Sequence, residues 1–205
     1  SDLFEDFFKW AMQQPETDCD SLMQTDDWSA EDVYRMLQGY LSQRLQSTGK
    51  AHLVSIFLDL LCYHFNYAET LLGEELLPMS EASLAQENAW ESPWQRSNKF
   101  RLVPFAYEIL DLLEMEGMHL EEMTTLFRPV GSVALFMRRQ NQVFCESLGE
   151  EMLQLLKRSD GSLSPREIFA GSVSQATGEE LVQFAVSEGL LHPAGHLPPD
   201  AIIMN

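Results

Sequence analysis

The sequence is poor in cysteine and in positive charge, and it has no long uninterrupted hydrophobic run. Its 205 residues include three widely separated cysteines, Cys19, Cys62 and Cys145. That spacing suits reduced thiols in a cytoplasm better than a disulfide framework or a zinc knuckle. A cytoplasmic protein is expected, and no signal peptide is expected either. Asp59, His64 and Asn66 interrupt the longest apolar stretch, and a bilayer disfavours such groups, so neither a membrane span nor a membrane partner is expected.

The shortage of bases gives the chain a strong negative charge. Thirteen Lys and Arg stand against 32 Asp and Glu, for a formal net charge of −19. This charge disfavours unselective binding to nucleic acid phosphates or anionic lipid. Apolar residues make up 45% of the chain, which is enough for a sizeable core and excludes a disordered protein.

The first 125 residues predict an acidic, all-helical domain. They carry 23 of the 32 acids and only seven of the 13 bases. Apolar residues at helical spacing predict helices over residues 3–11, from a cap at Ser29 to about Gln46, over residues 51–72 and over residues 100–115. Gly73 is expected to end the third of these. Residues 74–98 predict one weak helix followed by a surface connection.

Residues 126–205 predict a small winged-helix-like domain. Alternating apolar residues over 132–137 and 142–146 flank a turn at Arg139, Gln140 and Asn141 and predict a β-hairpin. Three helices should follow: one over residues 148–158, and two opened by capping boxes at Ser164 and Thr177. Gly189 should end the last helix before a short strand at Leu190. The predicted fold class is therefore mainly α, of the α+β type, in two domains.

No residue pattern indicates catalysis. The five histidines are scattered, and the pair His119 and Glu122 favours a helix start over half of a metal site. Asp59 in an apolar helix is expected to accept a hydrogen bond from Tyr63 or from another helix rather than to act as an acid or base. Cys62 and His64 are two residues apart and point in different helical directions. No catalytic residue, metal or cofactor is expected.

The bases of the second domain allow two binding functions. Six lie within 39 residues: Arg128, Arg138, Arg139, Lys157, Arg158 and Arg166. They are compatible with a regulator that binds DNA, with a module that binds a peptide along the hairpin, or with a merely solvated surface. The last long helix, Glu179–Glu188, holds three glutamates and no Lys or Arg, so it would repel DNA phosphates and DNA is disfavoured as a partner. A winged-helix transcriptional regulator or a protein–protein adaptor remains the alternative.

The stretch Phe127–Pro193 resembles the winged-helix recognition modules of ribosomally made, modified peptides, and ribosomal-oxygenase winged helices are similar. With the phrases AETLLGEELL at Ala68–Leu77 and PFAYEILDLLE at Pro104–Glu114, most of the chain resembles the accessory-subunit family that includes the methanobactin biosynthesis partner proteins. The resemblance implies a non-catalytic subunit of a heterodimer. It would bind a precursor peptide and present it to an iron-dependent barrel enzyme in natural-product biosynthesis.

The same resemblance implies a peptide-binding region on the hairpin and the last helix. On the hairpin it comprises Val133, Ala134, Leu135, Phe136, Met137, Arg138, Arg139, Val143, Phe144 and Cys145. On the helix it comprises Leu181, Val182, Ala185 and Val186. Arg138 and Arg139 would contact acidic residues of the peptide, which would add a strand to the hairpin.

Overall fold

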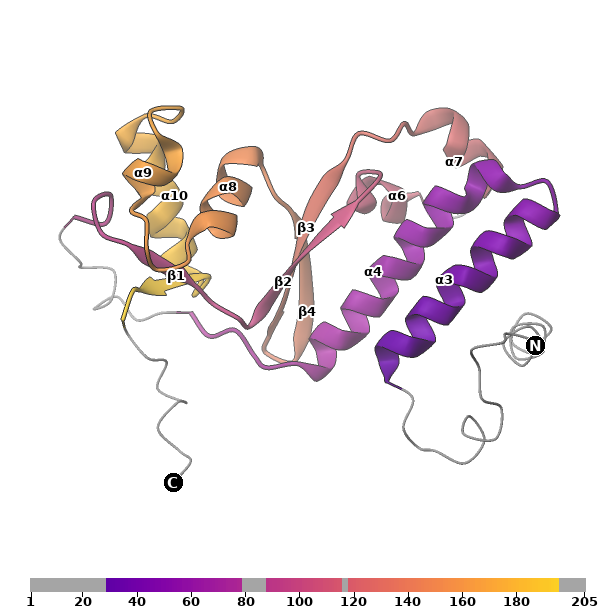
Figure 1. Cartoon of the computed structure of the whole chain (residues 1–205), viewed down its shortest axis with the longest axis horizontal. Coiled ribbons are helices and arrows are strands. Elements are labelled where there is room, and N and C mark those ends of the chain that lie inside the picture. Colours follow the sequence, from indigo (N-terminus) through magenta and orange to yellow (C-terminus); the bar gives the residue numbers. More distant parts are fainter. Residues whose placement is uncertain (1–28, 79–87, 116–117, 196–205) are drawn as a thin grey trace, which may run out of the picture. The chain divides into compact units, whose positions relative to one another are not determined.

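The computed structural model describes residues 29–78, 88–115 and 118–195. These residues form an α+β fold with a helical N-terminal part and a small antiparallel sheet region, as Figure 1 shows. This confirms the predicted fold class at that level. The helix predicted over residues 3–11 lies outside the described residues.

The chain divides into two compact units that are not consecutive in sequence. The first contains the described residues up to Phe65 together with Phe105–Gly131, and the second contains Asn66–Pro104 together with the residues from Ser132 onward. The predicted domains 1–125 and 126–205 therefore do not match these units. The reason is that Leu76 and other residues of the predicted helical half belong to the core of the second unit.

The first unit is built from helices. It contains α3 (Ala30–Ser47), the 3-10 helix η1 (Ala51–Leu53), most of α4 (Val54–Leu72), α6 (Ile109–Glu114) and α7 (Leu120–Leu126). The side chain of Ser29 accepts a hydrogen bond from the Asp32 N–H, so the predicted cap is confirmed. The predicted end of a helix before Gly73 is also confirmed. The rings of Tyr34 and Phe65 stack with centroids 4.3 Å apart and fix α3 against α4.

The prediction that residues 1–125 are all helical is wrong. Two strands, β1 (Trp94–Arg96) and β2 (Phe100–Phe105), precede α6, and a helix was expected over all of β2. Along β2 the buried residues are Phe100, Val103 and Phe105. Pro104 lies within the strand and disfavours helical conformation in the residue before it. Pro104 and the pairing of β2 with β3 therefore favour a strand, although the apolar spacing also fitted a helix.

The predicted hairpin is confirmed. Strands β3 (Ser132–Arg139) and β4 (Gln142–Ser147) pair in antiparallel register from Arg139 and Gln142 to Ala134 and Ser147. Gln140 and Asn141 have φ values of 49° and 61°, as a two-residue type I′ turn requires. Arg139, which was expected in the turn, is the last residue of β3 and pairs with Gln142. The three-stranded sheet has the order β2, β3, β4, and β5 (Leu191–Pro193) pairs separately with β1.

Three helices follow the hairpin, namely α8 (Glu150–Arg158), α9 (Pro165–Phe169) and α10 (Gln175–Ser187). The capping box at Ser164 is confirmed, with Glu167 as its second member. The capping box predicted at Thr177 is wrong, because α10 begins earlier and Ser174 accepts the hydrogen bond from the Thr177 N–H. Gly189 follows the helix with φ 73°, as expected for a residue that ends it.

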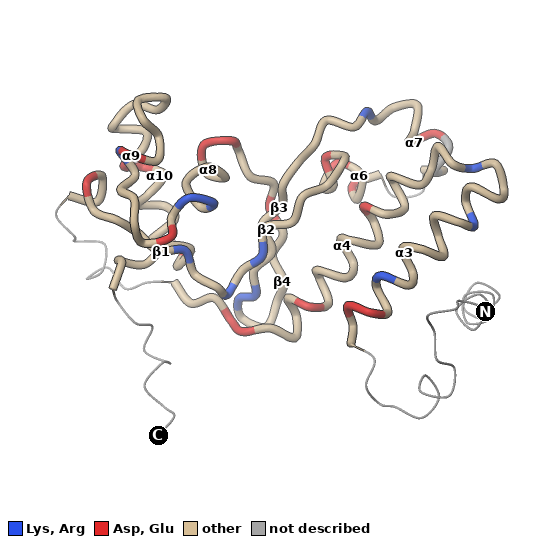
Figure 2. Tube along the Cα trace, viewed as in Figure 1, with Lys and Arg blue, Asp and Glu red and all other residues tan. Residues whose placement is uncertain are grey.

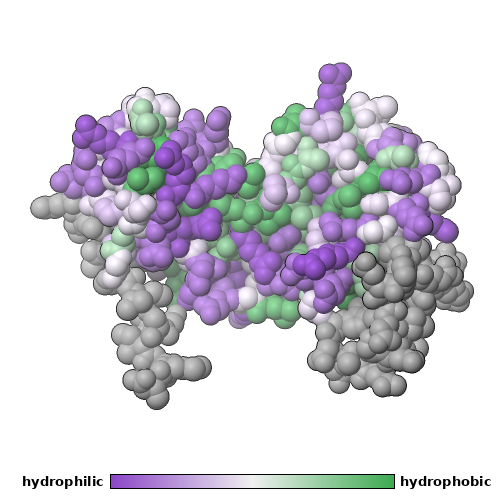
Figure 3. Space-filling model, in the orientation of Figure 1, coloured by the Kyte–Doolittle hydropathy of each residue, from purple (hydrophilic) through white to green (hydrophobic). Residues whose placement is uncertain are grey.

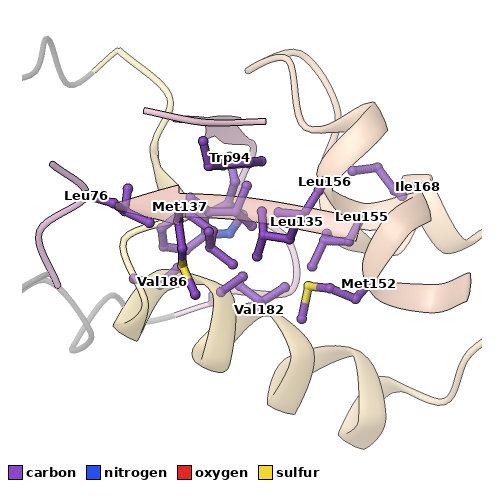
Figure 4. Packing of buried hydrophobic residues seen from close by; sticks show 14 of the residues in the cluster. Leu76, Trp94, Leu135, Met137, Met152, Leu155, Leu156, Ile168, Val182 and Val186 are labelled. Atoms are coloured by element: carbon purple, nitrogen blue, oxygen red, sulfur yellow. The ribbon is translucent and has the colours of Figure 1, made fainter. Parts of the chain in front are cut away.

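The core of the second unit lies between the sheets and these helices (Figure 4). Its largest fully buried side chains include Trp94, Leu135, Leu155, Leu156 and Ile168. The Trp94 indole donates a hydrogen bond of 2.8 Å to the Ala89 carbonyl, so its one polar group is satisfied inside the core. Within the ranges that the structure describes, no helix is long and apolar enough to cross a membrane.

Candidate functional site

The outer edge of β4 is the part of the second unit best placed to bind an extended chain. β4 is the last strand in the order β2, β3, β4, so no described strand pairs with its outer side. In a hairpin closed by a two-residue turn, the pair Arg139 and Gln142 exchanges backbone hydrogen bonds, and every second pair does so. The pair Arg138 and Val143 lies between two such pairs and exchanges no backbone hydrogen bonds. The backbone N–H and C=O of Val143 therefore point away from β3.

The side chains of β4 form two rows, one on each face of the sheet. Gln142, Phe144 and Glu146 are all exposed and lie on the face that also carries Leu135 and Met137. Phe144 is 40% exposed, which is high for an aromatic residue in a strand. The surface around α8, α9 and α10 is mostly hydrophilic on the side that Figure 3 shows. The exposed ring at the sheet edge is thus an apolar position available for contact.

Half of the predicted peptide-binding residues are buried, and five of these, Leu135, Met137, Val182, Ala185 and Val186, belong to the core of the second unit. The residues with 3% exposure or less are Ala134, Leu135, Phe136, Met137, Val182, Ala185 and Val186. Those that are partly exposed or exposed are Val133, Arg138, Arg139, Val143, Phe144, Cys145 and Leu181. Leu135 and Met137 pack in the same cluster as Val182, so side chains of this unit already fill the space between β3 and α10. Among the predicted residues, β4 is the segment with the most accessible positions.

Both arginines at the end of β3 are engaged within the second unit. Arg139 forms an ion pair with the Glu188 carboxylate and donates a second hydrogen bond to the Glu188 carbonyl. Arg138 donates to the Gly73 carbonyl at 2.8 Å and to the side-chain oxygen of Asn141 at 2.7 Å. These contacts hold the turn of the hairpin against α10 and the end of α4. They also engage the two guanidinium groups that were expected to contact acidic residues of a peptide.

Residues Glu75 and Leu76, which follow α4, lie beside the end of β3 at Arg138. The Leu76 N–H donates to the Arg138 carbonyl at 2.8 Å, and the side chain of Leu76 is buried in the core. The Glu75 carboxylate accepts a hydrogen bond from the Gln140 N–H. A Cβ on Gly189 would come within 2.3 Å of the Leu77 carbonyl oxygen, so this position has no room for a side chain. The side of β3 opposite to β4 is therefore occupied over this stretch.

The buried carboxylate of the first unit, Asp59, is held by a hydrogen bond within that unit. Asp59 accepts a hydrogen bond of 2.9 Å from the Tyr107 N–H, which agrees with the expected role as an acceptor but has a backbone donor. Burial raises the pKa of the Asp59 carboxyl, and hydrogen bonds from the backbone oppose that shift. Burial also raises the pKa of the Tyr34 phenol, and a hydrogen bond with Cys62 adds to the shift.

The described residues bring no metal-binding group together. His119 occupies the position before α7, as its helix-start interpretation predicted, and Glu122 is exposed in that helix. Within the described ranges, no three His, Cys, Asp or Glu side chains are placed to hold a metal ion. His196 and Cys19 lie outside these ranges.

Sequence reasoning missed a small polar cleft at the end of α4. It has a volume of about 210 Å³ and lies between the last turn of α4 and the start of β2. Two ion pairs cross it, one from Lys99 to Glu74 at 3.3 Å and one from Arg101 to Glu69 at 3.0 Å. The cleft depends on β2 being a strand, and the sequence predicted a helix there.

Figure 2 shows how charge is distributed along these elements. The start of α8 is acidic, with Glu150 and Glu151, and its end is basic, with Lys157 and Arg158.

Comparison of the whole sequence with protein-family models and with curated proteins gives no match.

Proposed function

We propose that this chain is a non-catalytic binding subunit whose second unit takes up an extended peptide by strand addition at β4. The observation that carries the proposal is that β4 ends the strand order and directs backbone groups of Val143 away from β3. A peptide strand placed there would satisfy these groups with main-chain hydrogen bonds, and its alternate side chains would meet Phe144 on one face.

The order of elements in the second unit supports a winged-helix-like recognition module. The hairpin β3–β4 is followed at once by α8, α9 and α10, in the order expected from the resemblance to recognition modules of ribosomally made peptides. In this proposal the peptide is such a precursor. Its modification would be carried out by an iron-dependent barrel enzyme with which the chain forms a heterodimer in the cytoplasm.

A regulator that binds DNA through α10 is less well supported. Glu179 and Glu180 are exposed on α10, and that helix contains no Lys or Arg. Carboxylates on a helix in the major groove would face the phosphates on both sides. The ion pair between Arg166 and Glu91 further reduces the positive charge near α9.

Hydrogen exchange with mass spectrometry would test strand addition directly. The full chain is mixed with peptides recovered with it from its native cell, and slower exchange in β4 is the expected result. Val143→Pro should abolish this protection, because proline removes an outward N–H without removing a hydrogen bond to β3. Val143→Thr keeps the N–H and the branched shape and serves as the control.

If Val143→Pro is folded and still binds the peptide with full protection of β4, strand addition at this edge is wrong. Binding of duplex DNA that weakens steeply as salt is raised, with no protection of β4 by any peptide, would support the regulator instead.

A further inference from the structure

The charges around β4 bear on which peptides its edge can accept. β4 contains Glu146 and no base, and α8 begins three residues after β4 with Glu150 and Glu151. All three carboxylates are exposed, and in the described part of the chain none of them is in an ion pair. The carboxylates of Glu150 and Glu151 are stabilised by the positive N-terminal end of the α8 dipole, which accounts for their position. Their negative charge is nevertheless exposed to solvent.

The bases nearest to β4 in the sequence do not offset the negative charge of Glu146, Glu150 and Glu151. Arg138 and Arg139 are the bases of the hairpin, and their guanidinium groups are directed to the Gly73 carbonyl and to Glu188. The side chain of Arg139 is only 18% exposed. An acidic peptide on β4 would therefore meet exposed carboxylates, and to reach a base of the hairpin it would have to break the ion pair of Arg139 or the hydrogen bonds of Arg138.

Phe144 supplies an aromatic ring to the same surface. Its ring lies between Gln142 and Glu146 in the exposed row of β4, so an added strand would place one of its own side chains over the ring. A cationic side chain two residues away in that strand would come close to Glu146. An aromatic face and a carboxylate in one row both favour a positively charged neighbour.

Resting on the proposed function, we infer that the segment taken up at β4 is a cationic peptide with apolar residues at alternate positions. Its cationic row lies on the face of Phe144 and Glu146, where Glu146 and Glu150 select it by charge, and its apolar row lies on the opposite face, beside Val143. This assignment replaces the acidic peptide that the sequence suggested for Arg138 and Arg139. The net charge of −19 would also speed the encounter with such a peptide at low salt.

Three blocked seven-residue peptides provide the test, with valine alternating with lysine, glutamate or glutamine. We expect the lysine peptide to bind the full chain at least tenfold more tightly than the glutamate peptide in 50 mM salt. The preference should shrink in 500 mM salt, because exposed charges are screened. Calorimetry measures affinity, and hydrogen exchange reports whether β4 is protected.

Reversing the charge of Glu146 and Glu150 tests whether these two residues cause the preference for the lysine peptide. Glu146→Lys with Glu150→Lys should reduce binding of the lysine peptide on the order of tenfold and improve binding of the glutamate peptide. Glu114→Lys with Asp111→Lys on α6 changes the net charge equally and should leave both affinities within twofold. Phe144→Ser should weaken the lysine peptide more than the glutamate or glutamine peptide, because it removes the aromatic face beside the cationic row.

The outcomes separate this inference from the proposed function. If the glutamate peptide protects β4 as well as the lysine peptide does, the cationic preference is wrong and strand addition stands. If the α6 variant lowers the lysine preference as much as the β4 variant does, the selection is by net charge and the assignment to Glu146 and Glu150 is wrong. If no peptide protects β4 at any salt concentration, strand addition itself is wrong.

Discussion

Replacing Gly178 by alanine should destabilise the protein, although the same change usually strengthens a helix. Gly178 is buried in the first turn of α10, where the ring of Trp90 lies against its Cα. A Cβ at this position would come within 2.0 Å of a Trp90 ring carbon and within 2.6 Å of a second. The ring cannot move away freely, because it stacks on Phe169 with centroids 5.9 Å apart.

Two opposing terms set the size of the effect. Alanine in place of glycine gains about 1 kcal/mol of helix propensity. Forcing a methyl group into a packed core costs about 1 to 3 kcal/mol, and the overlap with Trp90 favours the upper part of that range. The net expectation is a loss of about 1 to 2 kcal/mol in the free energy of unfolding.

Denaturant unfolding followed by tryptophan fluorescence and by circular dichroism would measure the change. Gly39→Ala is the matched control, because Gly39 is exposed in the middle of α3 and the substitution should stabilise its helix by up to about 1 kcal/mol. Trp90→Leu in the Gly178→Ala background should recover part of the loss. If Gly178→Ala is as stable as Gly39→Ala, the packing of Trp90 on α10 is wrong.

Three further predictions concern single side chains. Asp59→Asn should retain the acceptor for the Tyr107 N–H and be at least as stable as the wild type at pH 8. A carboxyl whose folded pKa is raised contributes stability below its unfolded pKa of about 3.9 and loses it as the pH rises through the folded value, so the advantage of asparagine should disappear at pH 4; an advantage that is equal at both pH values would contradict this. Ser174→Ala should cost about 1 kcal/mol in denaturation experiments and Thr177→Ala less than about 0.5 kcal/mol, whereas the reverse order would restore the cap predicted from sequence. Arg139→Met should lower the free energy of unfolding by about 1 to 3 kcal/mol and leave peptide affinity unchanged; loss of affinity in a stably folded variant would show that Arg139 contacts the peptide.

The elements that the sequence predicted correctly are those fixed by local chemistry. The cap at Ser29, the capping box at Ser164 and the turn at Gln140 and Asn141 each involve side-chain or backbone preferences within four residues. The alternation that predicts the hairpin is equally local. Such signals can be read without knowing what packs against them.

The errors arose where the local pattern fitted more than one structure. Residues 100–105 have apolar positions that fit a helix or a strand, and pairing with β3 selected the strand. Thr177 and Glu180 have the spacing of a capping box, but Ser174 was an equally suitable cap and extended the helix by one turn. The candidate site was affected in the same way, since alternation identifies Leu135 and Val182 as apolar but does not distinguish a core from a groove.

The interleaving of the two units has a consequence for how such a protein can be altered by recombination. Neither unit corresponds to one uninterrupted stretch of sequence, since the chain leaves the second unit after Pro104 and returns to it at Ser132. A segment beginning at residue 126 would lack β1, the partner of β5, and would also lack Leu76 and Trp94 from its core. A gene fragment encoding the hairpin and its three helices could therefore not be exchanged between proteins as an independent cassette. The second unit can be inherited intact only together with the helical residues inserted into it.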